Sequence, residues 1–431
     1  MGQKISPVKG TRDVLPGDTY LKKDDPWIRT GHLHLIEQAA RELFPLYGYR
    51  EARTPVLERT ALFARGIGDA TDIVAKEMYT FEDRDGAQVS MRPEGTASLV
   101  RAYVEHAVQQ QEPETKWWYA GPMFRHERQQ RGRYRQFTQI GVEALGSPGP
   151  RIDAEQIEML DRWLRALGVP FEMHVNTLGD AQCRPAYRTA LQDYLRAHSA
   201  ELCEDCRKRV ETNPIRVLDC KNARCQEVAA GAPKMEQFLC AACREHFDGL
   251  RAALGRLGVA HVVDPKLVRG LDYYTRTTYE AIATSGLGSQ STVAGGGRYD
   301  GLVRELGGSD VPGIGFAAGV ERLALLVAQA GRELAVRPLV FFAPLGPEEE
   351  ARADALALEL RKAGIPAEVS FRRSNPGNQM KRADALGARF ALVLGDAEMK
   401  TGRGKLKELK TGAEHEVDLS ALPAALRGLA P

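Results

Sequence analysis

Residues 116–145 read KWWYAGPMFRHERQQRGRYRQFTQIGVEAL. Two runs rich in β-forming residues, 116–125 and 134–145, flank a loop that is rich in arginine and glutamine. A strand followed by a charged loop and a returning strand indicates an antiparallel pair, and no regular alternation of strands and helices surrounds it. The segment therefore predicts an α+β fold, with helices packed on an antiparallel β-sheet, and excludes a doubly wound parallel sheet.

Segments on either side of this pair supply further elements. Residues 78–81 and 88–91 flank Asp85–Gly86, which is a strong signal for a β-hairpin. Apolar spacing predicts helices at 27–43, 94–108 and 320–327, and strands at 51–54, 273–283 and 291–295. These elements extend the antiparallel core in both directions along the chain.

A regular alternation begins only after Arg332. The pattern predicts strands at 339–343, 367–371 and 390–394, and helices at 348–363 and 378–386. Such alternation is typical of a small α/β domain with a mainly parallel sheet, and a length of 431 residues favours two or three domains. We therefore expect a core domain at 1–335, which contains a mostly helical insertion at about 199–260, and a C-terminal α/β domain at 336–431.

The composition is that of a globular chain with balanced charge. It holds 59 Lys and Arg against 57 Asp and Glu, a formal charge of +2, so a nucleic acid would have to be bound by local basic patches. No apolar run approaches the ~20 residues that span a bilayer. Seven cysteines in a chain of this length do not form a disulfide scaffold. The sequence predicts a soluble, cytoplasmic protein with no membrane partner.

Four segments carry residues suited to binding or catalysis. Phe124–Glu127 opens a loop with five arginines within residues 125–135, and arginine forks suit phosphate or carboxylate groups, although a solvated hairpin tip has the same composition. GIGFAAGVER (313–322) runs from a glycine-rich strand into a helix, and its glycines suit either the close approach of a ligand or tight packing. The spacing of these glycines is not that of the dinucleotide-binding motif GxGxxG. LVRGLDYY (267–274) and AGGGRYDG (294–301) are ambiguous when each is taken alone.

Taken together and in this order, these segments resemble the class II aminoacyl-tRNA synthetases, and most closely the histidyl-tRNA synthetase family. The matching segments are Pro55 and its flanks for the first class motif, 117–146 for the second, 313–322 for the third, LVRGLDYY (267–274) and AGGGRYDGL (294–302) for two segments peculiar to the histidine enzymes, and KGTRD (9–13) and RPEGT (92–96). The resemblance covers nearly the whole chain.

The resemblance implies both a fold and a reaction. The fold is an antiparallel class II core with flanking helices and a helical insertion, followed by a C-terminal α/β anticodon-binding domain. The core forms a homodimer through the region of the first motif. The reaction joins L-histidine and ATP to give histidyl-adenylate and pyrophosphate, and then transfers histidine to the 3′-terminal adenosine of tRNA(His).

The resemblance also implies which residues bind ATP. A carboxylate and an α-phosphate repel each other, so fixed positive charge must offset their approach. Arg125 would hold the α-phosphate, with Arg269 opposite it across the reacting atoms, and these two are the implied catalytic residues. Arg322 would hold the triphosphate tail and Glu127 would help to order ATP, which would arrive with Mg²⁺.

Histidine is implied to bind beside the nucleotide. Glu94, Thr96 and Gln139 would take its ammonium group, and Arg269 its carboxylate. Glu143 and Tyr274 would hydrogen-bond the two imidazole nitrogens, so that amino acids lacking them leave buried polar groups unpaired. The same resemblance adds Gly95 and Tyr273 to the histidine site.

Two parts of the chain are implied to contact tRNA. Gln130, Arg131 and Arg133 of the arginine-rich loop would approach the acceptor end. Residues 371–410 hold ten Lys and Arg against four Asp and Glu, a charge that suits the phosphate backbone, although an ordinary solvated face would have the same composition. The resemblance makes this C-terminal domain the anticodon binder.

The predicted insertion carries six of the seven cysteines. Cys203 and Cys206 form one CxxC pair, Cys240 and Cys243 form another, and Cys220 and Cys225 lie between them. Paired CxxC is a zinc-ligand pattern, yet the gap between the two pairs exceeds the usual 15–20 residues. Two alternatives stay open: a structural Zn²⁺ on Cys203, Cys206, Cys240 and Cys243, or reduced structural thiols with no firm metal site.

Other functions fit the motifs less well. A non-catalytic synthetase paralogue that regulates histidine biosynthesis would resemble the core, but such paralogues lack the anticodon domain and usually lose the ATP and tRNA motifs. A synthetase for threonine, proline or glycine would not be expected to carry LVRGLDYY. A nicotinamide dehydrogenase would require a βαβ unit around its glycines.

Overall fold

The computed structural model describes residues 5–16, 28–68, 71, 73–128, 130–268, 273–287, 291–334 and 337–429. The chain forms two compact units, Met1–Leu334 and Ala335–Pro431. Among the described residues, no helix is long and apolar enough to cross a membrane. Arg269, the second implied catalytic residue, lies outside the described residues.

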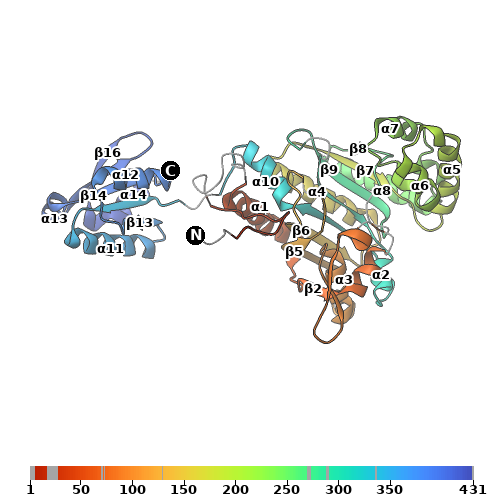
Figure 1. The fold of residues 1–431 in the computed structure, drawn as a ribbon, viewed down its shortest axis with the longest axis horizontal. Coiled ribbons are helices and arrows are strands. Elements are labelled where there is room, and N and C mark those ends of the chain that lie inside the picture. Colours follow the sequence, from red (N-terminus) through yellow and green to blue (C-terminus); the bar gives the residue numbers. More distant parts are fainter. Residues whose placement is uncertain are drawn as a thin grey trace. The chain divides into compact units, whose positions relative to one another are not determined.

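The first unit is built on an eight-stranded sheet (Figure 1). Its strands, in spatial order, are β1 (Arg50–Glu51), β5 (Thr115–Phe124), β6 (Gln136–Leu145), β11 (Gly313–Gly319), β10 (Thr292–Arg298), β9 (Thr275–Ala283), β7 (Phe171–Thr177) and β8 (Val262–Val263). Only the two edge pairs, β1 with β5 and β7 with β8, are parallel. The predicted antiparallel sheet is therefore confirmed.

One face of this sheet is apolar and is covered by helices. On β6, Ile140, Val142 and Ala144 are buried against the helices, whereas Gln139 and Glu143 point to the opposite face, as the two-residue period of a strand requires. The helices are α1 (Thr30–Leu43), α4 (Pro150–Ala166), α8 (Ala241–Arg256) and α10 (Val320–Gln329). The burial of this face leaves the other face of the sheet to carry polar side chains.

The polar face is partly covered by a small sheet and three shorter helices. These elements are β2 (Leu57–Arg59), β3 (Tyr79–Glu82), β4 (Gln88–Met91), α2 (Thr60–Ile67), α3 (Thr96–Glu105) and α9 (Leu302–Glu305). β3 and β4 form the predicted hairpin, and Gly86 takes the left-handed conformation in its turn, with φ of 83°. The start of α3 thereby reaches the polar face of β6.

A helical segment follows β7 and has its own apolar core. It holds α5 (Arg184–Ala197), α6 (Glu204–Thr212) and α7 (Ala223–Ala230), and it ends in α8. Asn222 caps α7, because its side chain accepts hydrogen bonds from the backbone N–H groups of Arg224 and Cys225. Helical structure begins at Arg184, upstream of residue 199, and the core of the segment includes Cys183.

The second unit is a five-stranded sheet with helices. Its strand order is β13 (Ala367–Val369), β12 (Val340–Pro344), β14 (Phe390–Leu394), β15 (Arg403–Glu408) and β16 (Glu414–Asp418), and its helices are α11 (Pro347–Lys362), α12 (Pro376–Ala385), α13 (Asp396–Thr401) and α14 (Leu422–Leu429). The first three strands are parallel, as predicted, whereas β15 and β16 pair antiparallel. These last two strands were not predicted, because β15 buries only Gly404 and Leu406 among charged residues.

Candidate active site

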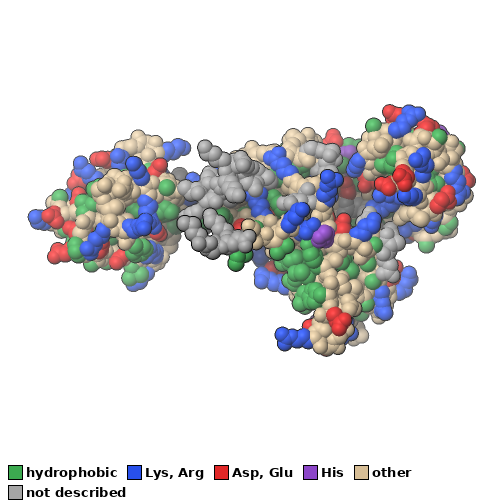
Figure 2. Space-filling model, in the orientation of Figure 1, with side chains coloured by type: hydrophobic (Ala, Val, Ile, Leu, Met, Phe, Trp, Pro, Cys, Tyr) green, Lys and Arg blue, Asp and Glu red, His purple; other side chains and the backbone are tan. Residues whose placement is uncertain are grey.

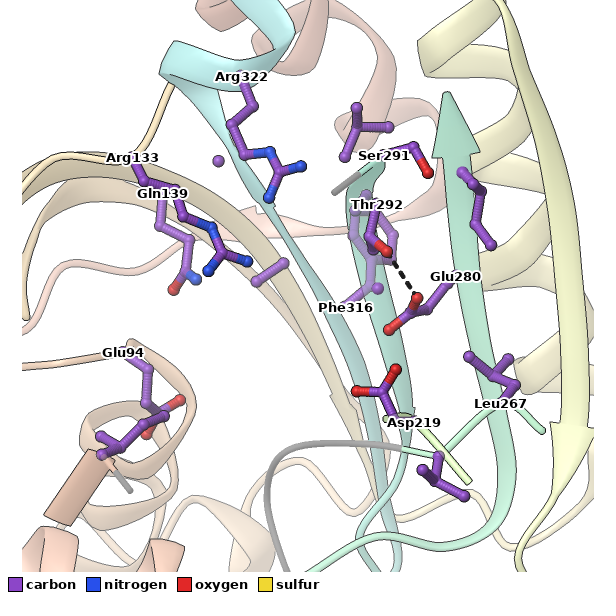
Figure 3. Close-up of a pocket in the computed structure, with 18 of the residues that line it drawn as sticks. Glu94, Arg133, Gln139, Asp219, Leu267, Glu280, Ser291, Thr292, Phe316 and Arg322 are labelled. Carbon is purple, nitrogen blue, oxygen red and sulfur yellow. Dashed lines mark hydrogen bonds between the residues drawn. The ribbon is translucent and has the colours of Figure 1, made fainter. Parts of the chain in front are cut away.

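A cavity of about 740 Å³ lies on the polar face of the large sheet. It is lined by β6, β9, β10 and β11, by the start of α3, by the loop between β5 and β6, and by residues 218–221 of the helical segment. Figure 3 shows side chains from these elements converging on one space. The second, third and fourth candidate segments and the arginine-rich loop thus meet in one place.

One end of the cavity holds two buried carboxylates. Glu94 accepts hydrogen bonds from the backbone N–H groups of Thr96, at 2.7 Å, and Ala97, at 2.8 Å, and so caps the start of α3. The hydroxyl of Thr96 in turn donates to Glu143 at 2.6 Å. Burial raises the pKa of both carboxyls, that of Glu143 to about 8. This end is therefore a dry, acidic pocket.

Glu143 is held by groups that come from three distant parts of the chain. Besides Thr96, the Tyr299 hydroxyl donates to it at 2.5 Å. Gly315 lies beside it in the paired strand β11, where an added Cβ would stand 1.8 Å from a Glu143 carboxylate oxygen. The glycine in the third motif thus makes room for Glu143, which explains why a bulkier residue does not fit there.

Tyrosines form the wall beside Glu143. The rings of Tyr273 and Tyr274 lie 4.8 Å apart between centroids, and those of Tyr273 and Tyr299 lie 5.7 Å apart. All three are buried in one apolar cluster, and all three line the cavity. The pocket therefore combines aromatic faces with hydroxyl and carboxylate groups, a lining that suits a small, flat, polar ring.

Cationic side chains gather elsewhere in the same cavity. Arg125 donates to the Pro93 carbonyl oxygen at 2.8 Å and lies 3.6 Å from Glu127, while Arg133 lies 3.4 Å from the other oxygen of Glu127. Arg322 comes from the first turn of α10 and projects towards the same region as Arg133 (Figure 3). Burial, together with the charge of Arg133, lowers the pKa of Arg322 to about 10. Three guanidinium groups around one carboxylate form a site for a polyanion.

Arg322 is positioned by the junction between β6 and α10. Glu321 precedes Arg322, and its two carboxylate oxygens both accept the backbone N–H of Thr138 in β6, at 2.8 and 3.0 Å. Burial raises the pKa of Glu321 to about 7. The contact fixes the start of α10 over β6 and so directs Arg322 into the cavity.

Two models of protein families match the chain. The model described as histidyl-tRNA synthetase matches residues 29–323, and the model described as anticodon binding domain matches residues 339–429. The chain belongs to the histidyl-tRNA synthetase family. The first match spans the whole cavity, and the second spans the five-stranded sheet of the second unit.

Full-length relatives agree with this membership. The protein named histidine–tRNA ligase of Anaeromyxobacter sp. is 52% identical over 99% of this chain and 100% of its own length, and that of Geobacter metallireducens is 48% identical over 98% and 99%. The crystal structure of the apo histidyl-tRNA synthetase of S. aureus is 34% identical, with a TM-score of 0.78 over 98% of this chain and 100% of that one. The class II fold expected from the sequence is therefore confirmed.

Most of the residues implied by the family resemblance line the cavity. They are Glu94, Thr96, Arg125, Glu127, Arg133, Gln139, Glu143, Tyr273, Tyr274 and Arg322. Gly95, Gln130 and Arg131 do not line it. Gly95 instead packs against the ring of Tyr119, since an added Cβ would lie 2.3 Å from that ring. In this histidyl-tRNA synthetase family member, glycine at 95 shapes the wall behind Gln139, to which the Tyr119 hydroxyl donates at 3.2 Å.

Sequence reasoning missed other residues at the site. Glu280 on β9 faces the cavity and accepts a hydrogen bond from Thr292 at 2.8 Å, and Asp219 reaches the same space from the helical segment (Figure 3). Tyr299 belongs to the AGGGRYDG segment, but the sequence assigned it no role of its own. The available signal for Glu280 was an acidic residue inside a predicted strand.

Arg298 of the AGGGRYDGL motif has a structural role. Arg298 is fully buried, forms ion pairs with Asp153 at 2.5 Å and Asp300 at 3.1 Å, and donates to the Ser147 carbonyl oxygen. Asp153 on α4 also contacts His246 of α8 at 2.8 Å. This network joins β10 to the helices behind the sheet, away from the cavity.

The cysteines are grouped differently from the sequence prediction. The structure forms two clusters, which we call the all-cysteine cluster (Cys203, Cys206, Cys220 and Cys225) and the mixed cluster (Asp180, Cys183, Cys240 and Cys243). The prediction of a single ligand set of Cys203, Cys206, Cys240 and Cys243 is therefore wrong. The physical reason is that the two CxxC pairs begin different helices, α6 and α8, each of which packs against other cysteines.

Proposed function

We propose that this chain is a histidine–tRNA ligase, which forms histidyl-adenylate and pyrophosphate from L-histidine and ATP and then transfers histidine to the 3′-terminal adenosine of tRNA(His). The observation that carries this proposal is one cavity with a buried Glu143 and tyrosines at one end and three arginines at the other. Membership of the histidyl-tRNA synthetase family supports it.

The arginine end binds the nucleotide. ATP enters as its Mg²⁺ complex, with Arg125 at the α-phosphate and Arg322 at the triphosphate tail. The histidine carboxylate attacks the α-phosphorus, the bond to the pyrophosphate group breaks, and the arginines offset the negative charge that accumulates during this step. Glu127, placed between Arg125 and Arg133, keeps the two guanidinium groups in position before ATP arrives. Arg269 belongs to this proposal as the partner of Arg125.

The acidic end selects the amino acid. Glu143 and Tyr274 bond the imidazole nitrogens, and Gln139 and Thr96 face the ammonium group. Glu94 lies beside them, where each of its oxygens accepts one backbone N–H group of α3 and keeps a second acceptor site for the ammonium group. Gly95 and Tyr273 complete the walls. An amino acid without ring nitrogens would leave Glu143 buried without a partner from the substrate, which disfavours its binding.

The contacts with tRNA are divided between the two units. Gln130, Arg131 and Arg133 lie on the loop between β5 and β6, at the rim of the cavity, and approach the acceptor end. The second unit, residues 336–431, binds the anticodon, which its family match supports. Residues 1–335 form the catalytic core, with an insertion that includes about 199–260.

We include two further expectations in the proposal. The first is a homodimer formed through the first-motif region around Pro55, where Leu57 and Phe81 of the small sheet are exposed and hydrophobic side chains gather around β2 (Figure 2). The second is a cytoplasmic location, where aminoacyl-tRNA is consumed in protein synthesis. A structural Zn²⁺ in the cysteine-rich segment also belongs to the proposal, with the ligands argued below.

The regulatory-paralogue alternative is disfavoured by what the chain retains. Such a paralogue would lack the anticodon domain, whereas the anticodon-binding model matches residues 339–429. It would also lose the ATP motif, whereas Arg125 and Arg322 both line the cavity. No observation in the described part of the chain favours this alternative.

The test is ATP–pyrophosphate exchange with each amino acid offered separately. We expect exchange with histidine alone and, in a second assay, histidine-dependent charging of tRNA(His). Arg125→Ala should abolish exchange, whereas Arg128→Ala, an exposed arginine that does not line the cavity, should leave exchange unchanged. Exchange with no amino acid would favour the regulatory paralogue, and exchange with a different one would refute the roles of Glu143 and Tyr274.

A further inference from the structure

All seven cysteines of the chain lie in the all-cysteine cluster and the mixed cluster. In each cluster the four ligand atoms lie within 4.8 Å of one another, and two of the four residues are buried while two are half-buried. The all-cysteine cluster occupies residues 203–225, between the two halves of the mixed cluster at 180–183 and 240–243. Two nested sites of the same architecture therefore account for every thiol in the chain.

The two clusters repeat one local structure. Cys203 is the N-cap of α6 and Cys240 is the N-cap of α8, and in each case a second cysteine follows three residues later in the first turn. The N-terminal N–H groups of a helix favour negative charge. Each CxxC pair thus places two sulfur atoms at the N-terminus of a helix.

Backbone N–H groups also point at the sulfur atoms of the cysteines that lie outside the CxxC pairs. The N–H of Cys203 donates to Cys225 Sγ at 3.2 Å, the N–H of Asn222 to Cys220 Sγ at 3.5 Å, and the N–H of Cys240 to Cys183 Sγ at 3.1 Å. Hydrogen bonds of this kind favour the charged form of a ligand and orient it. They reach the cysteines of both clusters that lie outside the CxxC pairs, Cys183, Cys220 and Cys225, so each site is organised from both sides.

The spacing of the sulfur atoms fits a tetrahedral metal. Zn–S bonds of about 2.3 Å in a tetrahedron place sulfur atoms about 3.8 Å apart. Cys203 Sγ and Cys220 Sγ lie 3.9 Å apart. A disulfide would hold only two of the four ligands, at about 2.0 Å, and would leave the convergence of the other two unexplained.

We propose that the helical segment holds two structural Zn²⁺ ions, one in the all-cysteine cluster and one in the mixed cluster. Each cysteine that coordinates zinc releases its thiol proton to solvent, so that zinc uptake is accompanied by proton release. Four protein ligands complete the tetrahedron, which leaves no open position and makes both ions structural.

The ion in the mixed cluster also acts as a positioning element for the histidine pocket. Asp180 lies 3.6 Å from Arg276 at the start of β9, and the N–H of Arg276 donates to the Gly179 carbonyl oxygen at 2.8 Å. Arg276 takes a left-handed backbone with φ of 48°, which a non-glycine residue adopts only when its surroundings enforce it. Arg184, one residue after Cys183, donates to the carbonyl oxygen of Tyr274. The ion therefore anchors the turn that holds Tyr274.

The first experiment measures metal in the full-length chain, purified without chelators and with any affinity tag removed. We expect two Zn²⁺ per chain by elemental analysis and two when the apo-protein is titrated with Zn²⁺. Co²⁺ in place of Zn²⁺ should give the intense visible absorption of tetrahedral cobalt thiolate sites. All seven thiols should resist alkylation until the metal is removed.

Variants then separate the two sites. Cys220→Ser and Cys240→Ser, at the half-buried positions, should each reduce the zinc content from two to one. Matched serine controls lie between the ligands of each CxxC pair: Glu204→Ser and Ala242→Ser change exposed residues and should keep two ions. Loss of the ion in the mixed cluster in Cys240→Ser should also raise the KM for histidine, whereas the controls Glu204→Ser and Ala242→Ser, which do not line the cavity, should leave this KM unchanged.

The wild-type measurement decides the proposal even if a variant fails to fold. A chain without zinc whose seven thiols alkylate freely would overturn it, and so would a mass deficit that reports disulfides. A content of one ion per chain would overturn the two-site form. An unchanged histidine KM in Cys240→Ser would refute the positioning role while leaving the metal sites in place.

Discussion

At the scale of single residues, the site depends on carboxyl groups that the fold keeps out of water. Glu143 is buried against Thr96, Tyr299 and Gly315, and its pKa is raised to about 8. A carboxyl with a raised pKa binds its proton more tightly in the folded chain than in the unfolded chain. Its contribution to stability is therefore complete below the unfolded pKa of about 4.5 and is lost as the pH rises through about 8.

This loss of stability with rising pH predicts how Glu143→Gln will behave. The free energy of unfolding of the wild type should fall relative to that of Glu143→Gln as the pH rises from about 5 to about 8, and the difference should be constant above that. Denaturant unfolding of both proteins at several pH values measures this difference in the free energy of unfolding. Glu321, whose pKa is also raised, is present in both proteins, so its contribution cancels in the difference. At the same time the kcat/KM for histidine in the variant should fall by about 10- to 100-fold. A difference that is independent of pH would contradict the buried, protonated carboxyl.

A second residue-scale prediction concerns Gly315. In Gly315→Ala the added Cβ would meet Glu143 at 1.8 Å and the Val142 carbonyl oxygen at 2.5 Å, so either the side chain or the strand must move. We expect a loss of about 1–3 kcal/mol of stability and a rise of at least about 10-fold in the KM for histidine, with a smaller change in the KM for ATP. Gly301→Ala is the control, because its nearest neighbour would lie 3.5 Å away. Equal changes in both KM values would argue against a local effect on the histidine pocket.

At the scale of elements, buried ion pairs fix the sheet to its helices. Asp153 of α4 pairs with Arg298 of β10, and both side chains are fully buried. Asp153→Asn should cost about 3–5 kcal/mol, because it leaves the Arg298 charge buried with less compensation. Asp161→Asn on the same helix removes a pair with the exposed Arg165 and should cost less than about 1 kcal/mol. Comparable losses in chemical denaturation would refute this distinction.

The same scale shows how far sequence reasoning reaches. Strands β5 and β6, the hairpin of β3 and β4, and the passage from β11 into α10 were predicted to within a few residues, because local period and turn chemistry determine them. The cysteine clusters were not predicted, since Cys183 and Cys240, which are in contact, are separated by 57 residues along the chain. The hydrogen bond of Tyr299 with Glu143 was not predicted either, because the two residues are 156 positions apart in the sequence. The roles in the cavity came from the family resemblance, and side-chain geometry arises only from the tertiary fold.

At the scale of the whole molecule, our proposal places the chemistry and the binding of the anticodon in separate units. The cavity lies wholly within residues 1–334, while β15 in the second unit exposes Arg403, Lys405 and Lys407 on one face of the strand. Because these groups do not contribute to the cavity, reversing their charge should affect only steps that need tRNA.

We therefore expect Lys405→Glu/Lys407→Glu to leave ATP–pyrophosphate exchange unchanged and to lower the kcat/KM for tRNA(His) by about 10-fold or more. The loss should shrink at higher salt, because contacts with phosphates are screened and the release of counterions gains less free energy there. Lys362→Glu/Arg427→Glu, which reverses the charge of two exposed residues on α11 and α14 of the same unit, is the control for net charge. If both variants lowered charging equally, the effect would come from long-range attraction of tRNA to the unit, and the exposed face of β15 would not be the binding surface.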